Sequence, residues 1–241
     1  MIILIRKQLL HMIFGLLLFF TAFSAMMWAG SLRTPEPVFS VNGANDPIVV
    51  IDAGHGGEDG GAVSPGGVKE SDINLEIAQK VNELLRFTGI RTAMIRREDS
   101  MVADSGLATM RERKVSDIHN RVATVNKMPN ACLLSVHQNS LPSSTVTHGA
   151  QAFWNENAEI WAQVTQELLN TSINDRPKEP RKIPSSIYLM NHVAVPAVLV
   201  ECGFLSNPQE TELLQTESHQ MKLATTISAG YLRWYAGEEE P

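Results

Sequence analysis

Three apolar runs constrain the fold of this chain more than any other feature of its sequence. The runs IVVIDA (48–53), ACLLSV (131–136) and VPAVLVE (195–201) are almost wholly apolar and do not alternate with polar residues. A strand with this composition is buried on both faces, which is typical of sheets that helices cover on both sides. The runs therefore predict an α/β fold with a mostly parallel central sheet.

The segments between these runs carry a helical pattern. In residues 71–88 the apolar positions fall on one stripe, which consists of Ile73, Ile77, Val81, Leu84 and Leu85. Further helices are expected over 117–128, 156–174 and 218–235, and further strands over 90–95 and 149–154. A capping box is expected at Asn207, with Pro208 at the first helical position and Glu210 at the third. Strands that alternate with helices predict one domain with helices on both faces of the sheet.

The N-terminus does not have the composition of a globular segment. Residues 9–30 contain no Asp, Glu, Lys or Arg, and Arg6 and Lys7 precede them, as in an export signal. A cleaved signal peptide and a retained membrane anchor both fit this pattern, so we expect the remainder to lie outside the cytoplasm. The chain is divided into a signal peptide or signal anchor (1–30), a linker (31–46) and one globular domain (47–237).

Charge and cysteine content exclude two classes of protein. The formal net charge is −6, and the exported part is more acidic still because residues 1–30 carry only basic charges. Nucleic-acid binding requires a basic surface, so we exclude it. Only Cys132 and Cys202 are present, both within apolar strand runs, which excludes a disulfide scaffold and predicts two buried thiols.

Polar residues follow or end all three apolar runs. His55 follows the first run, His137 directly follows the second, and Glu201 ends the third. Sites in open α/β sheets lie beyond the carboxyl ends of the strands, and imidazoles with a carboxylate are ligands of catalytic zinc. We therefore expect a metal site at this edge. The residues alone leave a carboxylate ligand near the first histidine open among Asp52, Glu58, Asp59, Glu70 and Asp72.

Four blocks of the chain resemble a known family. DAGHGGEDGGA, VKESDINLEIA, LLSVHQNS and PAVLVECGFLSN are similar to the signature blocks of the zinc-dependent N-acetylmuramoyl-L-alanine amidases of bacterial cell walls. The resemblance implies that the zinc ligands are His55, Glu70 and His137. It also implies that Glu201 is the catalytic carboxylate and that Asn139 and Arg121 bind substrate. The stretch MRERKVSDIHNRVATVNK and the N-terminal apolar segment are further similar to the branch of the family that acts in the spore cortex.

The resemblance also implies a reaction and its partners. Peptidoglycan glycan strands with stem peptides would be the substrate, and the amide between the lactyl group of muramic acid and L-alanine would be hydrolysed. In the spore cortex, this reaction leads to muramic-δ-lactam. The apolar N-terminal segment would attach the protein to the membrane if it is retained, while a requirement for a protein activator stays open. The stretch SLPSSTVTH (140–148) is too short for an autoinhibitory helix of the kind some family members carry.

Two alternative functions are compatible with the same residues. A wall-binding scaffold that lost its chemistry is one alternative, although no ligand position is replaced. A zinc carboxypeptidase or endopeptidase that acts on the stem peptide is the other. We expect the glycines around His55 to give a bulky glycan peptide access to the metal and to leave this ligand poorly ordered.

Overall fold

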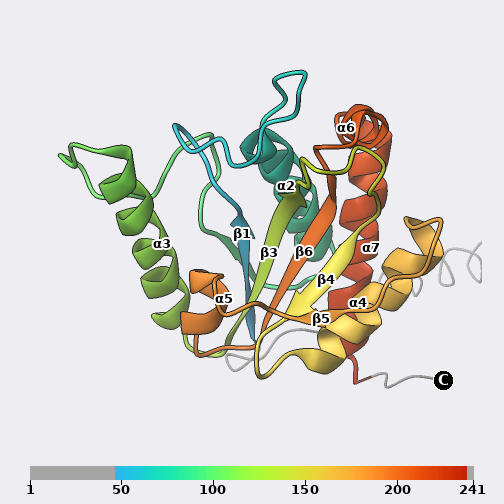
Figure 1. The fold of residues 1–241 in the computed structure, drawn as a ribbon. Coiled ribbons are helices and arrows are strands. Elements are labelled where there is room, and N and C mark those ends of the chain that lie inside the picture. The colour runs from blue at the N-terminus through green and yellow to red at the C-terminus, as the bar shows by residue number, and fades with distance from the viewer. Residues whose placement is uncertain (1–46, 238–241) are drawn as a thin grey trace, which may run out of the picture. The chain divides into compact units, whose positions relative to one another are not determined.

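The computed structural model describes residues 47–237 and confirms the predicted α/β fold with one central sheet (Figure 1). The sheet has six strands in the order β2-β1-β3-β6-β4-β5. Their bounds are Ile48–Ala53 (β1), Thr92–Met94 (β2), Ala131–Asn139 (β3), Gln151–Trp154 (β4), Arg181–Lys182 (β5) and Ala197–Phe204 (β6). β2, β1, β3 and β6 are parallel, whereas β4 pairs antiparallel with β6. The sheet is therefore mostly parallel, as predicted.

Helices cover both faces of this sheet (Figure 1). One face packs against α2 (Glu70–Phe87), α4 (Glu159–Ser172) and α7 (Glu217–Tyr235). The other face packs against α3 (Met110–Asn126) and the short α5 (Tyr188–His192), while α6 (Pro208–Leu214) follows β6. The molecule therefore has two apolar cores, one on each side of the sheet.

The two-residue period of the strands decides which side chains reach the functional edge. Val49 and Ile51 of β1 pack into the core beneath α2 and α7, whereas Val50 packs into the core beneath α3 and α5. On this second face, the apolar residues give way to polar ones near the carboxyl ends of the strands. These residues are Asp52, Ser135, His137 and Glu201. Strand alternation thus directs all of them to the side of α3 and α5.

Helix α3 is longer than the sequence analysis predicted. We expected it to begin at Asp117, but it begins at Met110 because Thr109 forms a complete capping box with Glu112. The Thr109 hydroxyl accepts a hydrogen bond from the Glu112 N–H at 3.2 Å, and the Glu112 carboxylate accepts one from the Thr109 N–H at 2.9 Å. The added turns are polar, and they lack the apolar stripe on which the prediction relied.

The capping box predicted at Asn207 is only half formed. Asn207 does cap α6, and its side-chain oxygen accepts hydrogen bonds from the Gln209 and Glu210 N–H groups at 2.9 and 3.4 Å. The Glu210 carboxylate does not return to the cap, because it instead accepts hydrogen bonds from the Gly149 and Phe204 N–H groups, both at 2.8 Å. Glu210 therefore joins α6 to the start of β4.

The cysteines and the segment between β3 and β4 agree with the predictions, whereas the N-terminal segments lie outside the described residues. Cys132 and Cys202 are both free and buried, as expected. Between β3 and β4, residues 140–148 contain no helix, which agrees with the absence of an inhibitory segment there. The predicted signal or anchor (1–30) and linker (31–46) lie outside the described residues. Among the described helices, none combines the length and the apolar character needed to span a bilayer.

Candidate metal centre

His55 lies in the loop after β1, and this loop is held more firmly than its glycines suggest. The backbone of His55 is left-handed, with a φ of 60°, which is uncommon outside glycine. Two buried arginines hold the neighbouring carbonyl groups: Arg121 donates to the His55 carbonyl at 2.7 Å, and Arg96 donates to the Gly54 carbonyl at 3.1 Å. The expectation of a poorly ordered ligand was therefore wrong, because sequence patterns do not show these distant donors.

Two glycines of this loop make room for the candidate ligands themselves. A Cβ atom on Gly54 would lie 2.2 Å from the His137 ring. A Cβ atom on Gly61, which has a φ of +66°, would lie 2.5 Å from a Glu70 carboxylate oxygen and 2.6 Å from the His55 ring. At these two positions glycine is required for ligand packing, whereas we had expected it to provide substrate access.

Glu70 is the first residue of α2, and its carboxylate is buried among hydrogen-bond donors. The side chain accepts hydrogen bonds from the Ala62 N–H at 2.8 Å and from the Gln138 N–H at 3.1 Å. It also lies 2.8 Å from His137 Nδ1 and 3.4 Å from His55 Nε2. Burial alone would raise the pKa of Glu70, but the hydrogen bonds and charges of the two histidines lower it below its ordinary value.

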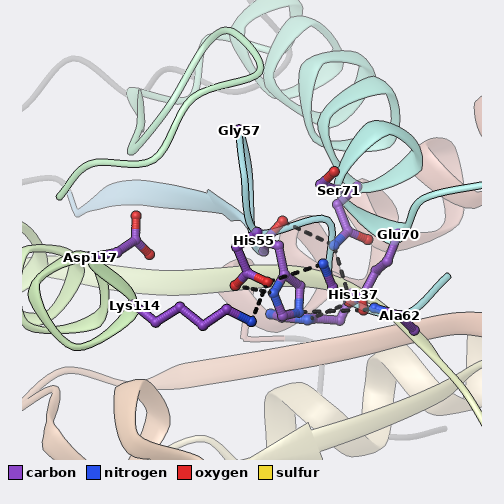
Figure 2. Close-up of polar contacts among 12 residues, drawn as sticks. His55, Gly57, Ala62, Glu70, Ser71, Lys114, Asp117 and His137 are labelled. Atoms are coloured by element: carbon purple, nitrogen blue, oxygen red, sulfur yellow. Dashed lines mark hydrogen bonds and ion pairs between the residues drawn. The ribbon is translucent and has the colours of Figure 1, made fainter. Parts of the chain in front are cut away.

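His55, Glu70 and His137 converge from three separate elements (Figure 2). Each offers one ligand atom, and these atoms lie within 4.8 Å of one another. The two imidazole rings are edge to face, with centroids 5.1 Å apart. Two imidazoles and one carboxylate form the ligand set of catalytic zinc sites that keep one position open. The residues present therefore fit a zinc ion.

The other carboxylates that the sequence left open as ligands have different partners. Asp52 pairs with Arg121 and accepts a hydrogen bond from the Ser135 hydroxyl at 2.7 Å. Glu58 forms an ion pair with Arg113 on α3. Neither belongs to the group of residues that could hold a metal.

Asp59 contacts the site, although it does so through His55. One of its carboxylate oxygens lies 2.8 Å from His55 Nδ1, on the opposite side of the ring from Nε2. Burial by itself would lower the pKa of His55, but hydrogen bonds with Asp59 and Glu70 raise it to about 10. From the sequence, Asp59 was only one of five candidates for the carboxylate ligand.

Glu201 lies beside His137 in the register between β3 and β6, and both line one cleft. Within the described part of the chain, its Oε2 atom is buried and has no hydrogen-bond partner. Burial raises the pKa of Glu201 to about 7, despite the opposing effect of the nearby His137 charge. A buried carboxylate oxygen that is free to bind a proton suits a general base or acid.

The two residues to which a substrate role was assigned have different surroundings in the structure. Asn139 lines the cleft at the end of β3, where its side chain accepts a hydrogen bond from the Ser140 N–H at 2.8 Å. Arg121 is only 2% exposed, and its guanidinium donates to Asp52, Asp117 and the carbonyls of Ala53 and His55. Arg121 therefore lies beneath the site, where protein groups already occupy its donors.

The cleft has a volume of 530 Å³ and two walls of different character. One wall is the face of α3 that carries Lys114, Asp117, Ile118 and Arg121, which follow helical spacing. The other wall includes residues 186–190 at the start of α5, among them Tyr188. This second wall could not be predicted from the sequence, because a five-residue helix is too short to show a helical hydrophobic period.

Comparison with known proteins agrees with this geometry. The sequence profile described as N-acetylmuramoyl-L-alanine amidase matches residues 49–233. The germination-specific N-acetylmuramoyl-L-alanine amidase of Bacillus subtilis (strain 168) is 36% identical over 198 residues, which cover 80% of this chain and 82% of the relative. This similarity agrees with the resemblance of the sequence to the branch of the family that acts in the spore cortex.

Solved structures show the same relationship. The CwlD amidase of Clostridioides difficile, solved in complex with the GerS lipoprotein, superposes with a TM-score of 0.75 at 30% identity and covers 80% of this chain and 100% of that one. The catalytic domain of CwlV from Bacillus (Paenibacillus) polymyxa var. colistinus gives a TM-score of 0.67 at 26% identity, with 80% and 99% coverage. The chain therefore belongs to the N-acetylmuramoyl-L-alanine amidase family and is an enzyme of that class.

Proposed function

We propose that this amidase depends on zinc and that His55, Glu70 and His137 are its ligands. The convergence of these residues in the cleft that contains Glu201 carries the proposal. Among the described residues, this is the only group of three or more His, Cys, Asp and Glu side chains placed to hold a metal. When bound, zinc supplies Lewis acidity that polarises a carbonyl group and lowers the pKa of water.

Glu201 is the proton carrier in this proposal. Glu201 lines the cleft, and its Oε2 atom is buried without a hydrogen-bond partner among the described residues. Glu201 takes a proton from the attacking water and delivers it to the departing amine of L-alanine. Asn139, which lines the same cleft, contacts the substrate, whereas Arg121 acts through the backbone of His55 because it is buried.

The bond that is cleaved joins the lactyl group of muramic acid to L-alanine of the stem peptide. Membership of the amidase family supports this assignment over a peptidase that acts further along the stem. Digestion of purified peptidoglycan followed by mass spectrometry should give peptides with a free L-alanine amine and intact glycan. Shortened stem peptides that remain attached to muramic acid would instead establish the peptidase alternative.

Metal analysis tests the other half of the proposal. Purified protein should contain one zinc ion, or should take up one on titration and gain activity. A protein that hydrolyses peptidoglycan equally well after complete metal removal would contradict the zinc dependence. A wall-binding scaffold would bind peptidoglycan and release no peptide, so the same digestion separates it from the enzyme.

The setting of the reaction follows from the relatives. We infer that the enzyme acts in the spore cortex, where its product leads to muramic-δ-lactam, because a germination-specific amidase is 36% identical. A protein partner is part of the same inference, since the Clostridioides difficile relative was solved with a lipoprotein.

Export depends on residues 1–30, and a double R6E/K7E variant should therefore accumulate inside the cell. Fractionation should distinguish an anchored 26.6 kDa form from a shorter secreted one.

A further inference from the structure

Asp59 contacts the candidate metal centre although it is not one of the three proposed ligands. Its Oδ2 atom lies 2.8 Å from His55 Nδ1, while His55 Nε2 faces Glu70 Oε2 at 3.4 Å. The two nitrogens of one imidazole are thus divided between two carboxylates. In metal sites, a carboxylate that accepts the second N–H of a ligand histidine fixes the tautomer and the orientation of the ring.

The protein holds Asp59 in place by three further contacts. Reciprocal backbone hydrogen bonds of 2.9 and 3.0 Å between Gly56 and Asp59 close a tight turn, which brings the carboxylate back to the ring. The second oxygen, Oδ1, accepts a hydrogen bond from the Gly61 N–H at 3.2 Å. It also pairs with Lys114 Nζ at 2.7 Å, and Figure 2 shows this lysine reaching from α3 toward the site.

The two carboxylate oxygens of Asp59 have different partners. Oδ1 is occupied by Lys114 and Gly61, so Oδ2 is left for His55. The Asp59 side chain is 14% exposed, which is far less than the 58% of its neighbour Glu58. Asp59 is therefore a partly buried, oriented group and not a solvated loop charge.

We propose that Asp59, held by Lys114 and the Gly61 N–H, is a positioning residue that keeps a proton on His55 Nδ1 and presents Nε2 for metal binding. This inference deepens the proposed function and rests on the zinc site assigned there. Asp59 is not one of the proposed ligands, and in this role it acts through His55. The inference gives α3 a second task, because Lys114 connects this helix to the first ligand.

Glu58 provides a matched control. It is the adjacent residue, it is also acidic, and it also pairs with α3, through Arg113, which precedes Lys114. Glu58 makes no contact with His55 among its described interactions. Substitutions of Glu58 and Asp59 therefore remove the same charge from the same loop and each break an ion pair with α3. Only the substitution of Asp59 also removes the partner of the imidazole and the acceptor of the Gly61 N–H.

The experiment measures zinc affinity by chelator competition on the purified chain for Asp59→Asn, Asp59→Ala and Glu58→Gln. Loss of a partner of this kind weakens metal affinity by about 10–100-fold. We expect Asp59→Ala to lie in this range. Asp59→Asn has a single acceptor oxygen for these two sets of donors, and an oxygen turned to Lys114 and the Gly61 N–H leaves the NH2 group facing Nδ1, so it should weaken zinc binding as well. Glu58→Gln should match the wild type. The absorption spectrum of the cobalt-loaded protein should change in both Asp59 variants and stay unchanged in Glu58→Gln.

Each outcome decides between the positioning role and a purely structural one. The melting temperature of the metal-free protein reports loop stability separately from metal binding. Equal zinc affinity and cobalt spectra in Asp59→Ala and Glu58→Gln would overturn the inference, even if Asp59→Ala melted earlier. If Asp59→Ala did not fold, Asp59→Asn would decide by the same two measurements. A wild type that binds zinc without releasing L-alanine peptides would refute the proposed reaction and leave this inference standing.

Discussion

Glu70 and Glu201 line one cleft, yet their carboxylates have opposite surroundings. Glu70 accepts several hydrogen bonds, and the two histidines keep its pKa low despite burial. Glu201 has a buried oxygen without a partner in the described structure, and burial raises its pKa. A carboxylate held in the charged form suits a metal ligand, whereas one that exchanges a proton suits acid–base catalysis.

The two glutamine variants should therefore fail differently. Glu201→Gln should keep zinc and lose the proton transfer, which contributes roughly 10²–10⁴-fold in rate. Glu70→Gln should weaken zinc binding itself, because a neutral amide oxygen is a poorer ligand than a carboxylate. Peptide release and zinc titration on both variants check this expectation. The reverse pattern would exchange the roles, and equal zinc loss in both would make Glu201 a fourth ligand.

The buried pair of Asp52 and Arg121 makes stability depend on pH. Burial alone would raise the pKa of Asp52, but the charges of Arg121 and His137 and the hydrogen bonds from Ser135 and Arg121 lower it below its ordinary value. A group whose pKa is lower in the folded state contributes stability above its unfolded pKa and loses it as pH falls through the folded pKa.

We expect the free energy of unfolding to fall between about pH 5 and pH 2, partly through Asp52. Asp52→Asn should reduce the slope of the unfolding free energy against pH by the equivalent of up to one proton, because the neutral amide does not titrate. Urea unfolding of both proteins across this range measures the slope. An unchanged slope in Asp52→Asn would show that other carboxyl groups cause the acid dependence.

Sequence patterns identified residues at strand ends and missed residues that act through others. His55, His137 and Glu201 could be proposed because the end of a buried strand fixes where its next side chains lie. Glu70 required the family resemblance, since the sequence alone did not rank the five nearby carboxylates firmly. Asp59 and Arg121 contact His55 through a folded loop and through α3, respectively, and such contacts leave no local pattern in the sequence.

Among the elements, α3 holds the ligand loop by several side-chain contacts. Its inward face lines the cleft, and Arg121 and Lys114 connect it to His55 and Asp59. Its first turns are polar, so they depend on the capping box of Thr109 and Glu112. The position of this helix therefore combines a local signal at its start with buried polar contacts further along.

Removal of the cap should weaken the fold without changing the metal site. Thr109→Ala should lower the free energy of unfolding by about 0.5–2 kcal/mol, as for other N-cap threonines. Thr124→Ala in the interior of the same helix is the control, and it should cost less because alanine favours helix interiors. Denaturant unfolding and zinc titration measure both effects. Weaker zinc binding in Thr109→Ala would mean that the first turn also positions the ligand loop.

The predictability of each element depended on its length and burial. The strands β1, β3 and β6 and the helices α2 and α7 were predicted because each buries a long apolar pattern. The two-residue β5 and the five-residue α5 were not, since such short segments show no period. The antiparallel direction of β4 depends on how the chain returns to the sheet, and alternation along a strand does not encode it.

At the scale of the whole molecule, the proposed ligands come from three parts of the fold whose ends meet at one edge of the sheet. His55 comes from the loop after β1, Glu70 from the start of α2, and His137 from β3. A metal bound by all three would act as a crosslink between the strand layer and a covering helix. A site of this kind exists only in the folded state, so zinc should stabilise the fold in proportion to its binding.

Thermal unfolding with and without zinc tests this coupling. Free zinc at 100 times its Kd should add about 2.7 kcal/mol of stability. For a domain of this size, 1 kcal/mol corresponds to roughly 2–4 °C, so the melting temperature should rise by about 5–10 °C. The rise should persist in Glu201→Gln and shrink in Glu70→Gln, since only the latter loses a ligand, and magnesium should not reproduce it. Zinc that activates the enzyme without moving the melting temperature would mean that the ion reaches the site with substrate and not as a resident of the folded protein.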